Sequence, residues 1–354
     1  MTRKPTRKLD GPNRRSVLAG AIAFGAPVFA PNLIGRALAS DAVDLAAAKR
    51  EGKVVVYTSA PMSSAQRIAT AFQNKYDIKV ELFRTGGAQV LRRYMMERQA
   101  GTIIADVLVS SDQAALIDLT AKGHFLPFKP AGFEQIPEAF RDPTAHYIPQ
   151  RVSVVSIYGR TDVIPVADLP KTWDDLLYPK WKGKLVMTNP SYSSLQVSVV
   201  AMMSRMRGWG YFEKLNANNV LVVQGNEQAV NTVKTGERPL AIFADAHYAN
   251  EARFAGHPIR TVFPAEGTFV LPAFTAVVKG SANPNAAKLM AEYTLGLEAQ
   301  KLWPPGGVYA ARADVDPPSG SAPLRDIKVV PMDFAHVQAS SAAVKKRFAE
   351  MFSS

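Results

Sequence analysis

Short apolar runs alternate with segments of helical periodicity, and this alternation constrains the fold of the chain more than any other feature. The run KVVVYTSA at 53–60 is typical of a buried strand, and the segment SSAQRIATAFQNKY that follows it is typical of a helix. A strand at 78–85, a helix at 86–101 and a strand at 105–111 come next. The repeated strand–helix order predicts an α/β fold with a parallel sheet.

The ends of these strands carry small and hydroxyl-bearing residues. Ligands of parallel α/β sheets bind beyond the carboxyl ends of the strands. Turn chemistry explains each loop taken singly, but three such loops on one sheet edge favour a binding site, and glycine lets the backbone approach a ligand. The predicted binding residues of this edge are Ser59, Ala60, Thr85, Gly86, Ser110 and Ser111.

The stretch TNPSYSSLQVSVVAMM at 188–203 places more hydroxyls at a helix start than capping requires. One interpretation is a cap with solvated turn residues; the other is a ligand held by free N–H groups and hydroxyls, since helix starts favour anions. The second interpretation predicts binding by Ser191, Tyr192, Ser193 and Ser194. Arg151 is the candidate charge partner of such an anion, with a solvated surface role as the alternative.

The rest of the chain repeats the strand–helix pattern. RVSVVSIYG at 151–159 predicts a strand, 218–256 reads as strand, helix, strand, helix, and 274–303 gives a strand and a long helix. The length of the chain, 354 residues, favours two domains. The absence of cysteine excludes disulfides, thiolate metal sites, cysteine nucleophiles and iron–sulfur clusters.

Residues 1–39 predict an export signal. They begin basic, carry the pair Arg14 and Arg15 before a broken apolar stretch, and end in the small-x-small pattern ALA. The arginine pair resembles the twin-arginine type of signal; a membrane-anchoring segment is the alternative. Removal of 1–39 takes away seven of the 42 basic and one of the 30 acidic residues, so the net charge falls from +12 to about +6. Charge this low and this dispersed argues against nucleic-acid binding.

Four segments carry a resemblance to a known family: RTGGAQVLRRYMMERQAGTIIADVLVSS, LPKTWDDLLYPKWKGKLVMTNPS, VVKGSANPNAAKLM and GGVYAARADVDPP. The chain resembles the periplasmic solute-binding proteins of ABC importers, in the branch that contains the ferric-ion-binding proteins. The resemblance implies a type II periplasmic-binding fold, with two lobes joined by crossover strands near 149–152 and 268–274. Lobe 1 is expected at 40–149, lobe 2 at 150–270, and a return to lobe 1 with C-terminal helices packing across the lobes at 271–354.

The resemblance also implies the function. A ligand is captured between the lobes in the periplasm and delivered to an ABC permease in the inner membrane, by a monomer without a cofactor; during export the chain would engage the twin-arginine machinery. The serines of 191–194 would then face the lobe 1 residues across the cleft.

Three ligand classes remain open. Ferric-binding relatives use two adjacent tyrosines, but FADAHYANE places His247 at the first position and Tyr248 at the second, and the relatives' early histidine is missing from VYTSAPMSS. An organic or phosphorylated anion is therefore favoured. A metal on His247 and Tyr248 is one alternative, and a thiamine-like cation held by Asp245 and aromatic rings is another. Packing of a helix on a strand also accounts for His247 or Tyr248 taken singly.

An enzyme is the rival class. The sequence has no G-x-S-x-G, H-E-x-x-H, P-loop or G-x-G-x-x-G motif, and its five histidines form no i, i+4 pair. A periplasmic hydrolase would need a base beside a serine, and His247 is the one histidine expected near the cleft. We therefore expect a binding protein rather than an enzyme or a scaffold.

Overall fold

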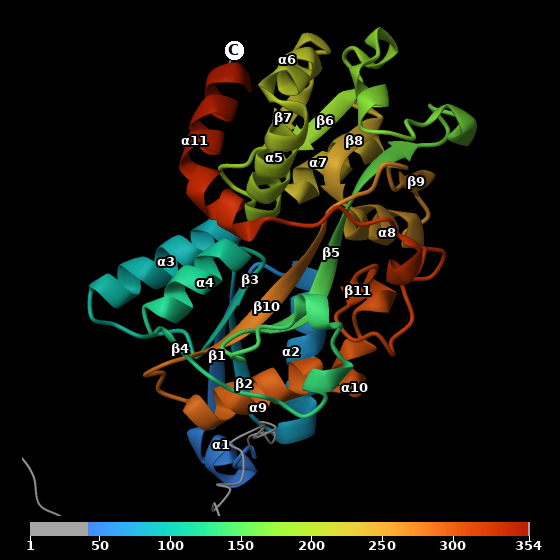
Figure 1. Cartoon of the computed structure of the whole chain (residues 1–354). Coiled ribbons are helices and arrows are strands. Elements are labelled where there is room, and N and C mark those ends of the chain that lie inside the picture. Colours follow the sequence, from blue (N-terminus) through green and yellow to red (C-terminus); the bar gives the residue numbers. More distant parts are fainter. Residues whose placement is uncertain (1–41, 353–354) are drawn as a thin grey trace, which may run out of the picture. The chain divides into compact units, whose positions relative to one another are not determined.

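Strand β5 (Ile148–Arg160) belongs to both halves of the sheet and so joins the two lobes (Figure 1). The structure is a computed structural model that describes residues 42–352, all within the compact unit Ala39–Ser354; the expected signal at 1–39 lies outside the described residues. Up to Val154, β5 pairs antiparallel with β10 (Val270–Val278), and from Val155 it pairs with β8 (Leu240–Asp245). We call the β10 side lobe 1 and the β8 side lobe 2.

Lobe 1 is built on the predicted parallel strands. Its sheet has the order β2-β1-β3-β10-β5, and β1 (Lys53–Thr58) pairs parallel with both β2 (Lys79–Arg84) and β3 (Val107–Ser110). The short strands β4 (Phe125–Leu126) and β11 (Tyr309–Ala310) pair with β10 and β5. The lobe 1 helices are α1 (Leu45–Glu51), α2 (Met62–Tyr76), α3 (Gly87–Gln99), α4 (Gln113–Ala121), α9 (Pro284–Leu295) and α10 (Leu297–Gln300).

Helices cover both faces of this sheet, which is why β1 is apolar throughout. Val54 and Val56 pack in one core cluster with Phe72 of α2, whereas Val55 and Tyr57 pack in another with residues of α3 and α4. Alternate residues of a strand point to opposite faces, so burial on both sides needs a continuous apolar run. Because β1, β2 and β3 run parallel, their carboxyl ends lie at the same edge of the sheet, the one toward lobe 2 (Figure 1).

Lobe 2 repeats the design. Its sheet has the order β5-β8-β6-β7, where β6 (Leu185–Thr188) pairs parallel with β7 (Leu221–Val223) and β8, and β9 (Ile259–Val262) pairs with β5. The helices are α5 (Ser194–Arg207), α6 (Trp209–Ala217), α7 (Asn226–Thr235) and α8 (Ala246–Phe254). Short 3-10 helices lie at Phe133–Gln135, Glu138–Phe140, Val166–Asp168, Asp174–Leu177, Pro179–Trp181, Pro304–Gly306 and Leu324–Asp326.

The C-terminal helix α11 (Phe334–Phe352) returns to lobe 2. It buries Val337, Val344 and Phe348 in the core that α5 and α6 share, and it also contacts α4 of lobe 1. Figure 1 shows α11 in red beside α5. None of the helices within 42–352 has the length and apolar character needed to cross a membrane.

The hinge differs in detail from the expected crossovers. The range 149–152 lies inside β5, but the exchange of partners falls later, between Val154 and Val155. Thr268 fixes this point, because its hydroxyl donates a hydrogen bond to the carbonyl of Val155 while its backbone bridges Val329. A third segment, leading to α11, therefore joins the two crossover strands at the hinge.

Candidate functional site

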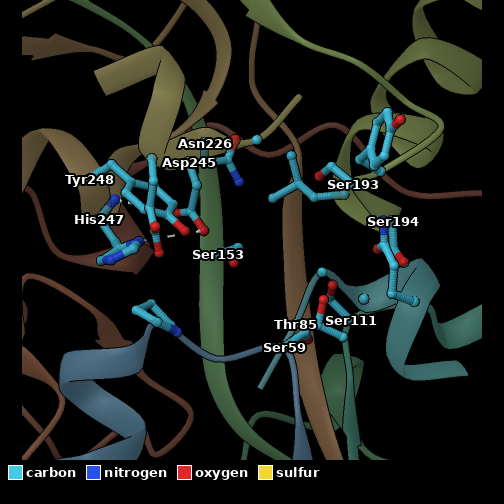
Figure 2. A pocket seen from close by; sticks show the side chains of 18 of the residues that line it. Ser59, Thr85, Ser111, Ser153, Ser193, Ser194, Asn226, Asp245, His247 and Tyr248 are labelled. Carbon is cyan, nitrogen blue, oxygen red and sulfur yellow. Dashed lines mark hydrogen bonds and ion pairs between the residues drawn. The ribbon is translucent and has the colours of Figure 1, made fainter. Parts of the chain in front are cut away.

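A cavity of about 320 Å³ lies between the lobes. The strand ends of lobe 1 close it on one side, the starts of α5, α7 and α8 close it on the other, and β5 forms its floor. Figure 2 shows Asp245, His247 and Tyr248 at the left of this cavity, and Ser193 and Ser194 at the right. A volume of this size lies at the lower end of the range of small-molecule sites, about 300–1,000 Å³, so the cavity suits a small solute.

The structure brings eleven of the fourteen predicted binding residues to this cavity. Lobe 1 contributes Ser59, Thr85, Gly86 and Ser111, and β5 contributes Arg151. Lobe 2 contributes Tyr192, Ser193, Ser194, Asp245, His247 and Tyr248.

Ala60, Ser110 and Ser191 do not line the cavity. Ala60 is buried, and its N–H donates to the hydroxyl of Thr58. The hydroxyl of Ser110 is also buried and accepts from the N–H of Asp112. The N–H of Ser191 donates to Asn189. All three positions shape their loops, and the adjacent residue of each loop faces the cavity instead.

Helix α3 begins at the cavity without a side-chain cap. Its N-cap residue, Gly86, offers no side-chain oxygen, and its first turn contains no acidic residue. Helix starts carry unpaired N–H groups and a partial positive charge. Ser59, beside this start, has a buried hydroxyl with no hydrogen-bond partner among the described residues. The lobe 1 wall therefore presents free donors.

The α5 start separates its two serines by role. The hydroxyl of Ser193 accepts from the N–H of Gln196 at 3.3 Å and caps the helix. Ser194 is 4 % exposed, and its hydroxyl has no partner within 42–352. Capping thus accounts for Ser193, and the hydroxyl of Ser194 remains available to a ligand.

Arg151 is the buried cation of the floor. It is 5 % exposed, its Nη1 donates to Ser153 at 3.3 Å, and its Nε has no partner in the described part of the chain. Burial lowers the pKa of Arg151, and the Asp245 carboxylate opposes that shift. The alternative of a solvated surface role is wrong, because β5 lies in the centre of the sheet.

Asp245 caps α8 and orders the opposite end of the cavity. Its Oδ1 accepts from the N–H of His247 at 3.1 Å, and its Oδ2 lies 4.0 Å from Nδ1 of that imidazole. Burial lowers the pKa of His247, so the ring is neutral near pH 7. Burial and the Asp245 carboxylate raise the pKa of Tyr248, which keeps its phenol protonated.

These donors suit Fe(III) poorly. Fe(III) prefers anionic oxygen ligands, whereas the α8 start offers it one imidazole, His247, and one phenol, Tyr248. Within residues 42–352, no three His, Cys, Asp or Glu side chains are grouped so that they could hold a metal ion. The neutral imidazole and phenol serve better as hydrogen-bonding groups.

Two polar contacts join the lobes at the rim. Arg84 Nη2 lies 3.0 Å from Glu227 Oε1, and the hydroxyl of Ser63 in α2 donates to Glu251 of α8 at 3.2 Å. The structure therefore has its lobes in contact around the cavity.

Sequence reasoning missed several lining residues. Pro61 and Arg84 adjoin the predicted loop residues, Gly87 and Gln89 lie in the first turn of the predicted helix at 86–101, and Ser153, Leu195 and residues 224–228 were not predicted to bind. The segment VVQGNEQ carries the same signal as the other loops, a strand end followed by glycine and a helix start. Ser153 lies two residues from Arg151 on a strand, so it shares the face of Arg151.

Comparison with known proteins places this geometry in context. A model of the bacterial extracellular solute-binding proteins matches residues 102–334. The iron uptake protein A1 of Synechocystis is 25% identical over 266 residues, which cover 70% of this chain and 72% of that protein. A putative 2-aminoethylphosphonate-binding periplasmic protein of Salmonella paratyphi A is 26% identical over 245 residues, covering 65% and 68%.

A solved structure confirms the fold. The periplasmic binding protein AfuA of Actinobacillus pleuropneumoniae, with exogenous fructose-6-phosphate bound, superimposes with a TM-score of 0.76 at 21% identity, over 85% of this chain and 99% of that one. The predicted α/β fold of two lobes, of the periplasmic-binding type, is thereby confirmed.

Proposed function

Because this chain belongs to the family of bacterial extracellular solute-binding proteins, we propose that it is the solute-binding component of an ABC importer. It acts as a periplasmic monomer, without a cofactor, and passes its ligand to a permease in the inner membrane. The names of the relatives support this role, since they describe binding proteins of the periplasm.

The ligand that the cavity favours is a small organic anion of the phosphate or phosphonate class. The buried Arg151, with its unpaired Nε, carries this proposal. A buried guanidinium is costly unless an anion pairs with it, and guanidinium groups pair well with phosphate oxygens. The uncapped α3 start and the unpaired hydroxyl of Ser194 add donors.

The non-anionic part of the ligand carries hydroxyl or amino groups. Arg84 and Arg151 are balanced by Asp245 and Glu227, so the formal charge of the lining side chains is zero, with the neutral His247 and Tyr248 between them. Such a mixed set of donors and acceptors suits a polar ligand better than a bare anion. Phosphorylated polyols and aminophosphonates both meet this description and fit about 320 Å³.

The other classes fit less well. A thiamine-like cation would meet Arg151 beside Asp245, and iron would meet the imidazole of His247 beside a single phenol, Tyr248, instead of a set of anionic oxygens. Hydrolysis would need a base bonded to a serine, and within 42–352 the hydroxyl of Ser194 has no partner at all. Binding without catalysis is therefore the proposal.

Calorimetric titration tests the ligand class. Native mass spectrometry first identifies any solute that co-purifies with the protein. The protein is then titrated with fructose 6-phosphate, 2-aminoethylphosphonate, ferric citrate and thiamine. We expect an organic phosphate or phosphonate to bind, and Arg151→Gln to weaken binding a hundredfold or more, the scale for a buried charge pair. Arg160→Gln is the control, since this arginine ends the same strand but pairs with Asp162 at the surface. Tight iron or thiamine binding, or unchanged affinity in Arg151→Gln, would overturn the proposal.

Export is tested separately. We expect the double variant Arg14→Lys with Arg15→Lys not to be exported. In the natural protein, we expect the mature chain to begin near Ser40 or Asp41. Normal periplasmic yield of that variant would exclude the twin-arginine route.

A further inference from the structure

The start of α3 in lobe 1 lies directly against the start of α5 in lobe 2. A Cβ placed on Gly86 would lie 2.6 Å from the side-chain oxygen of Gln89 in the same helix and 2.9 Å from the carbonyl oxygen of Tyr192. A Cβ on Gly87 would lie 2.8 Å from the hydroxyl of Ser194. Figure 2 shows Ser194 above Thr85, the residue before this glycine pair. The contacts with Tyr192 and Ser194 join lobe 1 directly to lobe 2 in the wall of the cavity.

The backbone does not explain these glycines. Gly86 has φ −61° and ψ 148°, which any residue adopts, and Gly87 is the first residue of a helix, where other residues are favoured over glycine. Neither has a positive φ. The Gln89 amide is the end of a flexible side chain and can move aside, whereas the Tyr192 carbonyl belongs to the backbone of lobe 2, so the approach of lobe 2 gives a reason for glycine at position 86.

Closing this contact without a ligand is energetically unfavourable. Two helix starts meet in it, and each carries a partial positive charge. The buried hydroxyl of Ser194 has no partner within 42–352. Bringing the lobes together therefore desolvates donors that only a bound acceptor satisfies.

We propose that Gly86 is a positioning residue for lobe closure: its missing side chain lets the α3 start seat against the Tyr192 carbonyl at the α5 start and so complete the cavity, and Gly87 lies beside Ser194 in the same contact. The contact is made by protein atoms of the two lobes, so it does not depend on which ligand the cavity binds. It adds to the proposed function a specific interlobe contact on which closure depends.

The absence of cysteine in the natural chain allows a direct test without ligand. A Cβ on Gly87 lies 3.5 Å from the Cβ of Ser194, within the range that a disulfide spans. The variant Gly87→Cys with Ser194→Cys should therefore form an intramolecular disulfide under mild oxidation. Solution scattering of the oxidised variant should show a compact particle. Adding reductant should return its radius of gyration to that of the variant before oxidation.

A substitution at Gly86 then tests the requirement for glycine. In the cysteine-pair background, Gly86→Ala should slow disulfide formation roughly tenfold to a hundredfold, the scale of an overpacked contact. Gly225→Ala is the matched control. Gly225 is also a helix N-cap with extended backbone, but no atom lies within 4 Å of its Cβ position, so the disulfide should form at the original rate.

The outcomes separate this inference from the choice of ligand. Failure of the cysteine pair to link while each single variant folds, as judged by its melting curve, would overturn the proposed contact. Equal rates for Gly86→Ala and Gly225→Ala would overturn the requirement for glycine. Neither result depends on which solute binds, and neither would be changed by finding a metal or a cation in the cavity.

Discussion

Arg84 of lobe 1 and Glu227 of lobe 2 form an ion pair of 3.0 Å across the cavity rim. The guanidinium also donates to the carbonyl of Ala60, so the loop after β1 holds it in place. Glu227 lies in the first turn of α7, where a carboxylate favours the helix start. The pair thus links a strand end of one lobe to a helix start of the other.

Breaking this pair should have a small effect on ligand retention. The Glu227 side chain is 58 % exposed, and pairs of this kind contribute about 0–1 kcal/mol. We expect Glu227→Gln to raise the ligand dissociation rate by roughly fivefold at most, and added salt to reduce the difference. Glu298→Gln is the control, since it breaks the exposed pair with Lys75 inside lobe 1. A larger loss in stopped-flow measurements would mean that Glu227 binds the ligand itself.

The two serines at the start of α5 should separate stability from binding. Ser193→Ala removes the helix cap, which costs about 1 kcal/mol of unfolding free energy, with little effect on affinity. Ser194→Ala removes a hydroxyl that has no partner in the described residues, so stability should hold while affinity for an anion falls roughly tenfold to a hundredfold. Denaturant unfolding and calorimetry of the two variants give the comparison. Equal binding losses would contradict this assignment.

Much of the site was predictable because it follows a general rule of α/β sheets. Ligands meet strand ends and helix starts, and these are recognisable in one sequence where the strand is long and apolar. Residues 224–228 obey the same rule, since they link a predicted strand to a predicted helix, but the sequence does not show that this strand ends at the cavity, because that depends on the parallel pairing of β7 with β6.

Other features depend on contacts between distant parts of the chain. The burial of Arg151 depends on the strands that pair with β5, and sequence spacing does not contain that information. The hinge position depends on a bond from Thr268 to the backbone of Val155. The contact of Gly86 with Tyr192 joins residues of different lobes, so the glycine is explained only when both lobes are seen together.

The protonation state of Tyr248 in the complex should distinguish an anionic ligand, which leaves a phenol, from iron, which binds a phenolate. Burial and Asp245 raise its pKa, so we expect Tyr248→Phe to change anion affinity only a few-fold, about the value of one neutral hydrogen bond. Ferric citrate should produce no tyrosinate charge-transfer band in the visible spectrum of the natural protein. Under the metal alternative, Tyr248→Phe and His247→Ala would each abolish binding, while Ser194→Ala would bind normally.

The stability of the protein should fall at mildly acidic pH because of His247. Burial lowers the pKa of this histidine below the ordinary value of 6.5, whereas in the unfolded chain it titrates near that value. Below about pH 6.5 the unfolded state therefore binds a proton that the folded state does not, and stability is lost as the pH falls. Above that pH both states are neutral and the contribution is constant.

The replacement His247→Gln should remove this dependence. We expect its melting temperature to fall less than that of the natural protein between about pH 7.5 and 5.5, the range in which free histidine titrates. Burial also lowers the pKa of His124, which lies outside the cavity, so His124→Gln should flatten the profile less. Parallel profiles for the natural protein and His247→Gln would mean that Asp245 and Glu251 stabilise the protonated ring as well as burial opposes it.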